Sequence, residues 1–254
     1  MKKINEFSKL GVYIIFAVAI FSLAIVLSAS GRYFFKGSSS EISVTGSASL
    51  NFTSDLVVWS GAFTSSDMDL KKAYAQIKND RDIIESFLIK KGLKKENFNF
   101  LSIDIEKKYK QKNYFNDEGK IIDREQIFTG FELIQQLKVS SSDIELVEQI
   151  SNEITDLIEK NIFLTSFPPK YYYTKLGELK IEMIKLASED GLLRAKTAIE
   201  GANGTLGGVL SSNIGVFQIL GANSNDSYSW GGTLNTAHKN KTAYINVKQR
   251  YEIK

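Results

Sequence analysis

The most apolar stretch of the chain lies close to its N-terminus. Residues 10–29 read LGVYIIFAVAIFSLAIVLSA, with no charged residue and no proline. A helix of this length rises about 30 Å, which is the thickness of the hydrocarbon core of a bilayer. Three lysines precede the run and two basic residues follow it, so the positive-inside tendency favours a cytoplasmic N-terminus. The pattern predicts one transmembrane helix that exports everything after it.

This helix divides the chain into four predicted parts. They are a cytoplasmic tail over residues 1–9, a transmembrane signal anchor over 10–30, a linker over 31–40 and a folded domain over 41–254. A cleaved secretory signal is the alternative, because small residues that suit a cleavage site lie at Ser28–Ser30. The apolar run exceeds the roughly 7–15 residues of a usual signal core, which favours the uncleaved anchor. Either outcome places the domain outside the cytoplasm.

Beyond the linker, a period of two residues predicts several β-strands. From Ile42 to Leu50, apolar or small residues alternate with Ser and Thr, as in a strand buried on one face. Residues 98–109 and 126–139 are predicted to form a hairpin, because Asn116-Asp117-Glu118-Gly119 between them suits a turn. The other predicted strands are 56–64, 162–173 with a bend at Pro168-Pro169, 209–220 and 242–253. The polar segment Gly221–Lys241 is predicted to be a loop with a disordered tip.

Three segments follow a helical period instead. The first begins after Asp67 as N-cap and ends at Gly92, which suits a left-handed C-cap. The others cover residues 143–159 and 174–200. The predicted buried stripes are Leu70, Ala73, Tyr74, Ile77, Ile84, Phe87 and Leu88; then Val147, Ile150, Ile154, Leu157 and Ile158; then Leu176, Leu179, Met183, Leu186, Ala187 and Leu193. The element order predicts an α+β fold, in which one or two mostly antiparallel sheets pack against three helices.

Charge and composition narrow the function classes. The chain carries a net charge of +3, but its first 36 residues hold five basic side chains against one acidic side chain. The folded part is therefore close to neutral and lacks the bulk positive charge that nucleic acid binding requires. There is no cysteine, which excludes disulfides, thiolate metal sites, cysteine nucleophiles and a lipoprotein anchor.

Few residues offer chemistry. His238 is the only histidine and lies in the polar loop, where a solvated role is the ordinary interpretation and a triad or metal site the alternative. Carboxylate pairs for acid and base work exist at Asp104 with Glu106, which share a strand face, and at Glu189 with Asp190. Solvent-facing charges give the same pattern.

Two further clusters have structural and functional interpretations. Gly201, Gly204, Gly207 and Gly208 follow a helix and precede a strand without a Gly-Lys-Ser/Thr, so they suit a helix C-cap and turn better than a phosphate loop. Tyr171–Tyr173 suit core packing, a subunit interface or stacking on a ligand. The sequence therefore predicts no catalytic, cofactor-binding or metal-ligating residue, and no cofactor.

The order of these motifs resembles the SIMPL domain family, also called DUF541, over residues 41–254. The resemblance rests on the opening Ile42-Ser43-Val44-Thr45-Gly46-Ser47-Ala48, the helix end Lys91-Gly92-Leu93 and the tyrosine-rich hairpin, on Ala187, Asp190, Arg194, Ala195 and Ala198 followed by Gly204, Leu206, Gly207 and Val209, and on the closing Ala243, Ile245, Val247 and Tyr251. The Pro168-Pro169 bend and Gly191, where the family usually has alanine, depart from its pattern.

The resemblance implies a bacterial envelope protein, with links to stress tolerance in some members, a tendency to form homo-oligomers, and no catalytic residues to carry over. We therefore expect a single-pass protein of the bacterial cytoplasmic membrane with an extracytoplasmic C-terminal domain. It contacts the bilayer through residues 10–30 and acts without catalysis, by binding or assembly, on a ligand that the sequence does not define. The alternative function is a carboxylate-based hydrolase of envelope glycans.

Overall fold

The computed structural model describes residues 17–26 and 40–254. Residues 17–26 form a helix with every position exposed. The predicted transmembrane segment 10–30 extends beyond these residues at both ends, and the predicted tail 1–9 and nearly all of the linker 31–40 lie outside the described residues. Within the described ranges, no helix combines the length and the apolar character needed to span a bilayer.

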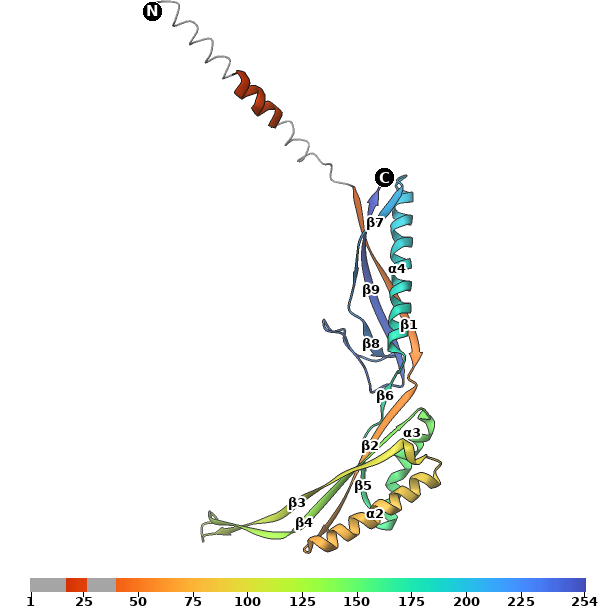
Figure 1. Ribbon diagram of the computed structural model, residues 1–254. Coiled ribbons are helices and arrows are strands. Elements are labelled where there is room, and N and C mark those ends of the chain that lie inside the picture. Colours follow the sequence, from red (N-terminus) through yellow and green to blue (C-terminus); the bar gives the residue numbers. More distant parts are fainter. Residues whose placement is uncertain (1–16, 27–39) are drawn as a thin grey trace, which may run out of the picture. The chain divides into compact units, whose positions relative to one another are not determined.

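The α+β fold with antiparallel sheets is confirmed. The first sheet has the strand order β3-β4-β2-β5, and β6 also pairs with β2 (Figure 1). All of its strand pairs are antiparallel. Its strands are β2 (Leu56–Asp67), β3 (Phe98–Phe115), β4 (Ile121–Ser141), β5 (Phe163–Ser166) and β6 (Lys170–Tyr172). The predicted bend at Pro168-Pro169 separates β5 from β6, because proline has no N–H for a ladder.

The first core lies between this sheet and the helices α2 (Leu70–Lys90) and α3 (Ile144–Glu153). Alternate residues of β2 and β4 are buried, including Trp59 and Phe63 of β2 and Leu133 of β4. The indole N–H of Trp59 donates to Ser166 Oγ at 3.0 Å, and that hydroxyl donates to Ser151 O at 2.7 Å. The largest buried side chain is thus both packed and hydrogen-bonded, as a buried Trp requires.

Helix α2 differs from its prediction in two details. Its N-cap is Asp69, whose carboxylate accepts from Lys71 N, while the carboxylate of Asp67, two residues earlier, accepts from Asp69 N. Its buried stripe is Ala73, Ile77, Asp80, Ile84 and Leu88. The prediction that Tyr74 is buried is wrong, because Tyr74 is 51% exposed. A stripe at three- and four-residue spacing covers a narrow face, and Tyr74 lies about 100° around the helix from Ala73. Gly92 has φ 100°, as its predicted left-handed role requires.

The helix predicted over residues 143–159 changes type midway. Asp143 is the N-cap of α3, and its side chain accepts from Leu146 N. From Ile154 to Lys160 the chain is a 3-10 helix, η2. With three residues per turn, Ile154 and Leu157 align toward the core, whereas Ile158 turns outward and is 60% exposed. The prediction that Ile158 is buried is therefore wrong.

The second sheet has the order β1-β9-β7, with β8 pairing β9. Its strands are β1 (Glu41–Thr53), β7 (Leu206–Ile214), β8 (Gln218–Gly221) and β9 (Asn240–Ile253). The strand predicted over 209–220 is divided at Gly215, whose N–H donates to Asn246 O at 2.8 Å. In β1, the alternating face predicted from Ile42 to Leu50 is confirmed, because those positions are the less exposed ones.

Helix α4 (Leu176–Gly201) buries Leu179, Met183 and Ala187, which form a second core with Ala243, Ile245 and Val247 of β9. Further along α4, Ala195 and Ile199 are buried. Spacing of four residues sets this stripe, so Leu193 lies off it and is 64% exposed. Leu186 is exposed as well. The predictions that these two leucines are buried are therefore wrong.

The chain divides into two compact units. Among the described residues, one includes 40–45, Gly191–Asn213 and Lys248–Lys254; the other comprises Gly46–Asp190 and Ile214–Val247. The hairpin and the pocket described next lie wholly within the second unit.

Candidate functional site

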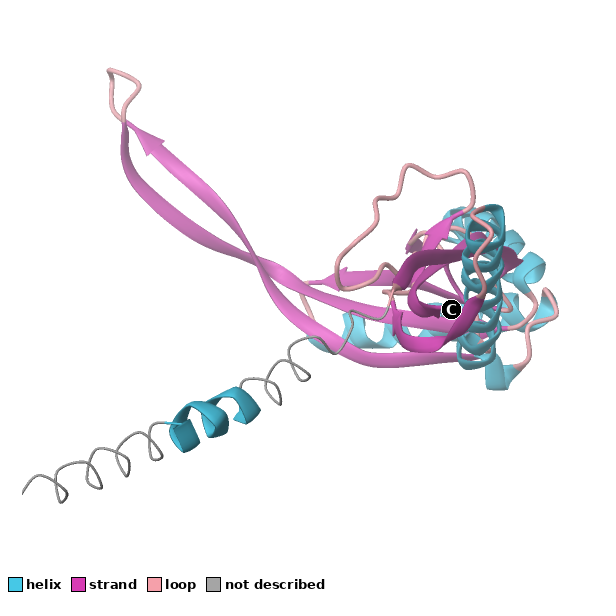
Figure 2. Cartoon of the chain, turned by 90° about the horizontal axis from the view of Figure 1, so that it is seen from above, coloured by secondary structure: helices cyan, strands magenta, loops and turns pink. Residues whose placement is uncertain are grey.

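The β3–β4 hairpin continues well past the rest of its sheet (Figure 2). Strand β4 pairs with β2 only from Phe131 onward, whereas Ile121–Gly130 pair with β3 alone. We call residues Lys108–Gly130 the arm. The predicted hairpin is confirmed, but its strands are longer than predicted. The arm lacks the regular apolar alternation from which the other strands were predicted. Both edges of the arm are open, since β3 is the outer strand of the sheet.

Gly130 forms the root of the arm. Its φ is 127°, and a Cβ at this position would lie 2.7 Å from Asp67 O, where β2 ends. The pairing register shifts beside it, between Lys108 and Tyr109. Only glycine combines this backbone conformation with such close approach, so Gly130 lets β4 pass the end of β2 and run on as half of a ribbon.

Apolar side chains continue from the first core along the arm. Phe131, packed against that core, contacts Phe128 with ring centroids 5.2 Å apart, and Phe128 contacts Tyr109 at 5.7 Å. Toward the tip, Phe115 is 58% and Ile122 is 66% exposed. Isolated two-stranded hairpins are marginally stable in water, so the exposed apolar residues of the arm make it a candidate interaction surface.

The two strands of the arm carry different charges. Strand β3 contributes Lys108, Lys110 and Lys112, whereas β4 contributes Asp123 and Glu125 with Arg124 between them. A hydrogen bond from Lys108 to Glu132 raises the pKa of that lysine. Tyr114 OH donates to Glu125 at 2.7 Å. The arm thus presents a basic edge and a more acidic edge, each with free backbone groups that can accept a further strand.

A second feature is the segment Ala222–Lys239, which we call the aromatic loop. It is fixed by Lys241, whose side chain is 1% exposed. The ammonium donates to Asn235 O at 2.6 Å, His238 O at 2.8 Å and Tyr171 O at 3.1 Å. Burial lowers the pKa of Lys241 to about 8, and the charge of Asp226 acts in the opposite direction. The expectation of a disordered tip is replaced by a loop with a bonded interior.

Asp226 holds the other side of the aromatic loop. Its carboxylate accepts from Gly221 N at 2.8 Å and from Asn235 Nδ2 at 2.7 Å. The backbone hydrogen bond from Gly221, followed by that with Ser224, lowers the pKa of Asp226. Residues near Leu234 also pair with β8, because Ile219 N donates to Thr233 O and Asn235 N donates to Ile219 O. The loop is therefore organised before any ligand arrives.

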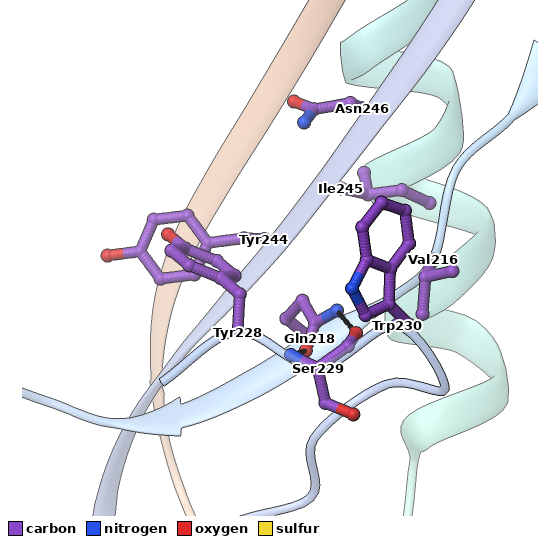
Figure 3. A pocket seen from close by; sticks show the side chains of 8 residues that line it. All are labelled: Val216, Gln218, Tyr228, Ser229, Trp230, Tyr244, Ile245 and Asn246. Carbon is purple, nitrogen blue, oxygen red and sulfur yellow. Dashed lines mark hydrogen bonds between the residues drawn. The ribbon is translucent and has the colours of Figure 1, made fainter. Parts of the chain in front are cut away.

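A pocket of about 460 Å³ opens between the aromatic loop and the strands β8 and β9 (Figure 3). Buried Gln218 ties the loop down, since its Nε2 donates to Ser229 O at 2.6 Å and its Oε1 accepts from Ser229 N at 3.3 Å. This clamp places Tyr228 and Trp230 on either side of Ser229. The lining residues are Val216, Gln218, Tyr228, Ser229, Trp230, Tyr244, Ile245 and Asn246.

This pocket was not predicted from the sequence. Its signal was present in Tyr228-Ser229-Trp230, an aromatic pair inside an otherwise polar loop, and in Tyr244 and Asn246, which share one face of β9. The register that places Gln218 opposite Tyr244 comes from long-range pairing of β8 with β9, which the local pattern does not specify.

The structure gives His238 a structural role. Its backbone N–H donates to Asn235 Oδ1, and its backbone O accepts from Lys241. The ring packs so closely on Gly221 that a Cβ there would lie 2.5 Å from Nδ1. No group of three or more His, Asp or Glu side chains suited to a metal ion occurs within residues 17–26 and 40–254.

Neither of the predicted carboxylate pairs lines the pocket. Asp104 and Glu106 are exposed on β3, opposite Ile134 and Glu132. Asp190 accepts from Ser47 N at 2.8 Å and so holds β1 to α4. Glu189 lies 3.9 Å from Lys185 in an exposed i,i+4 pair.

The glycine cluster is a helix C-cap and turn, as predicted. Gly204 N donates to Ile199 O at 2.9 Å, and Asn203 adopts φ 58°. Gly207 leaves no room for a Cβ, which would lie 2.9 Å from Glu252. These residues therefore close α4 onto β7.

The tyrosines at 171–173 are packed within the fold. Tyr171 OH donates to Glu148 at 2.7 Å, and burial together with that carboxylate raises the pKa of Tyr171 to about 12. Tyr173 contacts Phe52 with ring centroids 4.8 Å apart and packs against the second core. Core packing is therefore observed for Tyr171 and Tyr173.

Two cores, antiparallel sheets and a helix C-cap built on glycine define an α+β protein. The chain matches the family SIMPL, described as a protein of unknown function (DUF541), over residues 42–247. It therefore belongs to the SIMPL family, as the sequence motifs predicted. None of the curated proteins compared with the chain is significantly similar to it.

Proposed function

We propose that this SIMPL-domain protein is anchored in the bacterial cytoplasmic membrane by residues 10–30 and carries its folded part on the extracytoplasmic side. There it acts without catalysis, by binding and by self-assembly through the arm. The observation that carries the proposal is the arm itself, a two-stranded ribbon with two open edges and exposed apolar side chains. A role in stress tolerance of the envelope is what the resemblance to the family implies, and the features of the arm do not bear on it.

The N-terminal segment supports the anchoring. Val18, Ile20 and Phe21 are each between 64% and 70% exposed on the helix of residues 17–26. A helix that is apolar all round needs an apolar environment on every side, and the uncharged run 10–29 in which it lies is long enough to meet a bilayer.

The arm supports self-assembly through its charge pattern. The basic edge of β3 complements the more acidic edge of β4 in a second copy, and apolar side chains such as Phe115 and Ile122 lose water when two ribbons meet. Main-chain hydrogen bonds to an open edge add affinity without a catalytic group.

The orientation is tested by fusing alkaline phosphatase to the C-terminus after Lys254. We expect phosphatase activity on intact cells, because that enzyme becomes active only outside the cytoplasm, and we expect the fusion in the membrane fraction. A fluorescent fusion at the same point serves as the matched control and should be dark if exported. Activity that appears only after lysis contradicts the proposed orientation, and a shortened soluble product indicates cleavage near Ser28–Ser30.

Self-assembly is tested in the membrane with single cysteines, since the chain has none of its own. We expect Gln111→Cys, in the arm, to give cross-linked dimers or larger species with a bis-maleimide reagent. Lys78→Cys, at an exposed position of α2, is the control and should remain largely monomeric. Equal cross-linking at both positions would mean random collision, and its absence at position 111 would remove the arm from the proposal.

A further inference from the structure

The pocket beneath the aromatic loop has the features of a ligand site. Trp230 is 99% exposed, although burying a Trp side chain is strongly favourable. Tyr228 and Tyr244 meet edge to face with centroids 5.6 Å apart. In Figure 3 the Trp230 ring is on the same side of the pocket as Val216 and Ile245, and the tyrosine pair is on the opposite side. Three aromatic rings therefore surround a concave space, whose volume of about 460 Å³ lies within the usual range for small-ligand pockets.

The polar groups of the pocket are available to a ligand. Within the described part of the chain, Trp230 Nε1, the hydroxyls of Tyr228 and Tyr244, and the Asn246 amide form no hydrogen bond with another protein group. Gln218 is occupied by Ser229. The free groups include one that only donates and three that both donate and accept, so they can pair with a ligand that offers hydroxyls, which do both.

The lining is also uncharged. None of its eight residues carries a formal charge, so it has no partner for an acidic or basic ligand, whose desolvation would go uncompensated. An uncharged hexopyranose fits both requirements. Its ring presents a face of C–H groups to an aromatic side chain, and its rim presents hydroxyls to the amide and the phenols.

We propose that this pocket binds a neutral saccharide chain, with Trp230 and the Tyr228–Tyr244 pair as stacking platforms and Asn246 as the hydrogen-bonding group at its end. Gln218 is a positioning residue, because its clamp on Ser229 fixes both loop aromatics. The loop is already ordered by Lys241 and Asp226, so little conformational entropy is lost on binding. This inference does not depend on self-assembly through the arm.

The two tryptophans make the test direct. Trp59 is fully buried and Trp230 almost fully exposed, so changes in fluorescence on binding report Trp230. The full-length protein, in a detergent without a sugar headgroup, is titrated with the tetrasaccharides of β-1,4-linked N-acetylglucosamine, β-1,4-linked glucose and α-1,4-linked glucose. We expect at least one to shift the emission to the blue and to protect Trp230 from acrylamide quenching.

Variants distinguish binding in the pocket from nonspecific binding, and calorimetry measures the affinity of each. Trp230→Ala should weaken binding of that sugar at least about tenfold, and Gln218→Met should weaken it by about threefold to tenfold without unfolding the second core. Tyr74→Ala, which removes an exposed tyrosine of α2, should leave the affinity unchanged. A tetramer of galacturonate should bind more weakly than its neutral counterparts.

Three results would overturn the proposal. One is the absence of binding by all three neutral tetrasaccharides in the millimolar range. Another is binding that persists in Trp230→Ala. The third is binding of a decaproline peptide in their place with the same dependence on Trp230, which would identify a peptide groove instead.

Discussion

Replacing Lys241 with methionine should lower the free energy of unfolding by about 2–3 kcal/mol, because buried carbonyls that lose their donor cost about 1–3 kcal/mol each and the lost cost of burying an ammonium offsets part of this. The carbonyls of Tyr171, Asn235 and His238 all lose the same partner. We expect amide hydrogen exchange in the aromatic loop to accelerate in parallel. Chemical denaturation and exchange measured by mass spectrometry provide the two readouts.

Lys239→Met is the matched control. Lys239 lies two residues away, and its ammonium pairs at the surface with Glu145 and Glu148. Such exposed pairs contribute about 0–1 kcal/mol, so this variant should remain close to the parent. If both lysine variants lost the same stability, the three-carbonyl arrangement would have no special role.

The pH dependence of the Lys241 effect has a defined sign. Burial lowers the pKa of Lys241 from 10.5 to about 8, so between these values the unfolded chain binds a proton that the folded protein has released. Stability rises with pH wherever the unfolded state binds more protons. The difference in the free energy of unfolding between the parent and Lys241→Met should therefore increase from about pH 8 toward pH 10.5 and stay constant below about pH 8. A constant difference throughout would show that the carbonyls hold the proton on the ammonium.

Gly130→Ala should disrupt the root of the arm. An alanine Cβ would lie 2.7 Å from Asp67 O, and the residue would have to keep φ 127°. A non-glycine residue in such a conformation costs about 1–3 kcal/mol before any steric conflict with the backbone, so we expect a loss of at least about 2 kcal/mol in thermal or chemical unfolding.

The same substitution should also reduce bis-maleimide cross-linking through Gln111→Cys, because the arm would leave its register with β2. Gly208→Ala is the control, since a Cβ there meets no atom within 4 Å. A folded Gly130→Ala protein of normal stability and normal cross-linking would mean that the arm tolerates a different path past the end of β2.

The sequence predicted most of the elements, because their signals are local. The alternation from Ile42 to Leu50 and the left-handed Gly92 are each determined by a few neighbouring residues. Ile158 was misplaced because the change to a 3-10 helix alters which residues share a face. Leu193 was misplaced because the contact face of α4 follows Ala187 and Ala195, and small residues carry little apolar signal.

The candidate sites were harder to predict than the fold. The order of the aromatic loop depends on Lys241, a charged residue that ordinarily indicates a solvated surface. The pocket requires Gln218, Ser229 and Tyr244 to meet through strand pairing and a loop hydrogen bond. The length of the arm was underestimated because Lys110, Lys112 and Asn113 resemble a loop in composition, although they continue β3.

The two edges of the first sheet differ in how readily another strand could pair with them. On one side, Pro168 and Pro169 break the border into β5 and β6, each too short to serve as a template for another chain. The other edge, which β3 and the arm form, is long and uninterrupted. Pairing of a further strand with the body of the sheet is thereby restricted to the β3 side, whereas the arm, which extends past β2, is open along both of its strands.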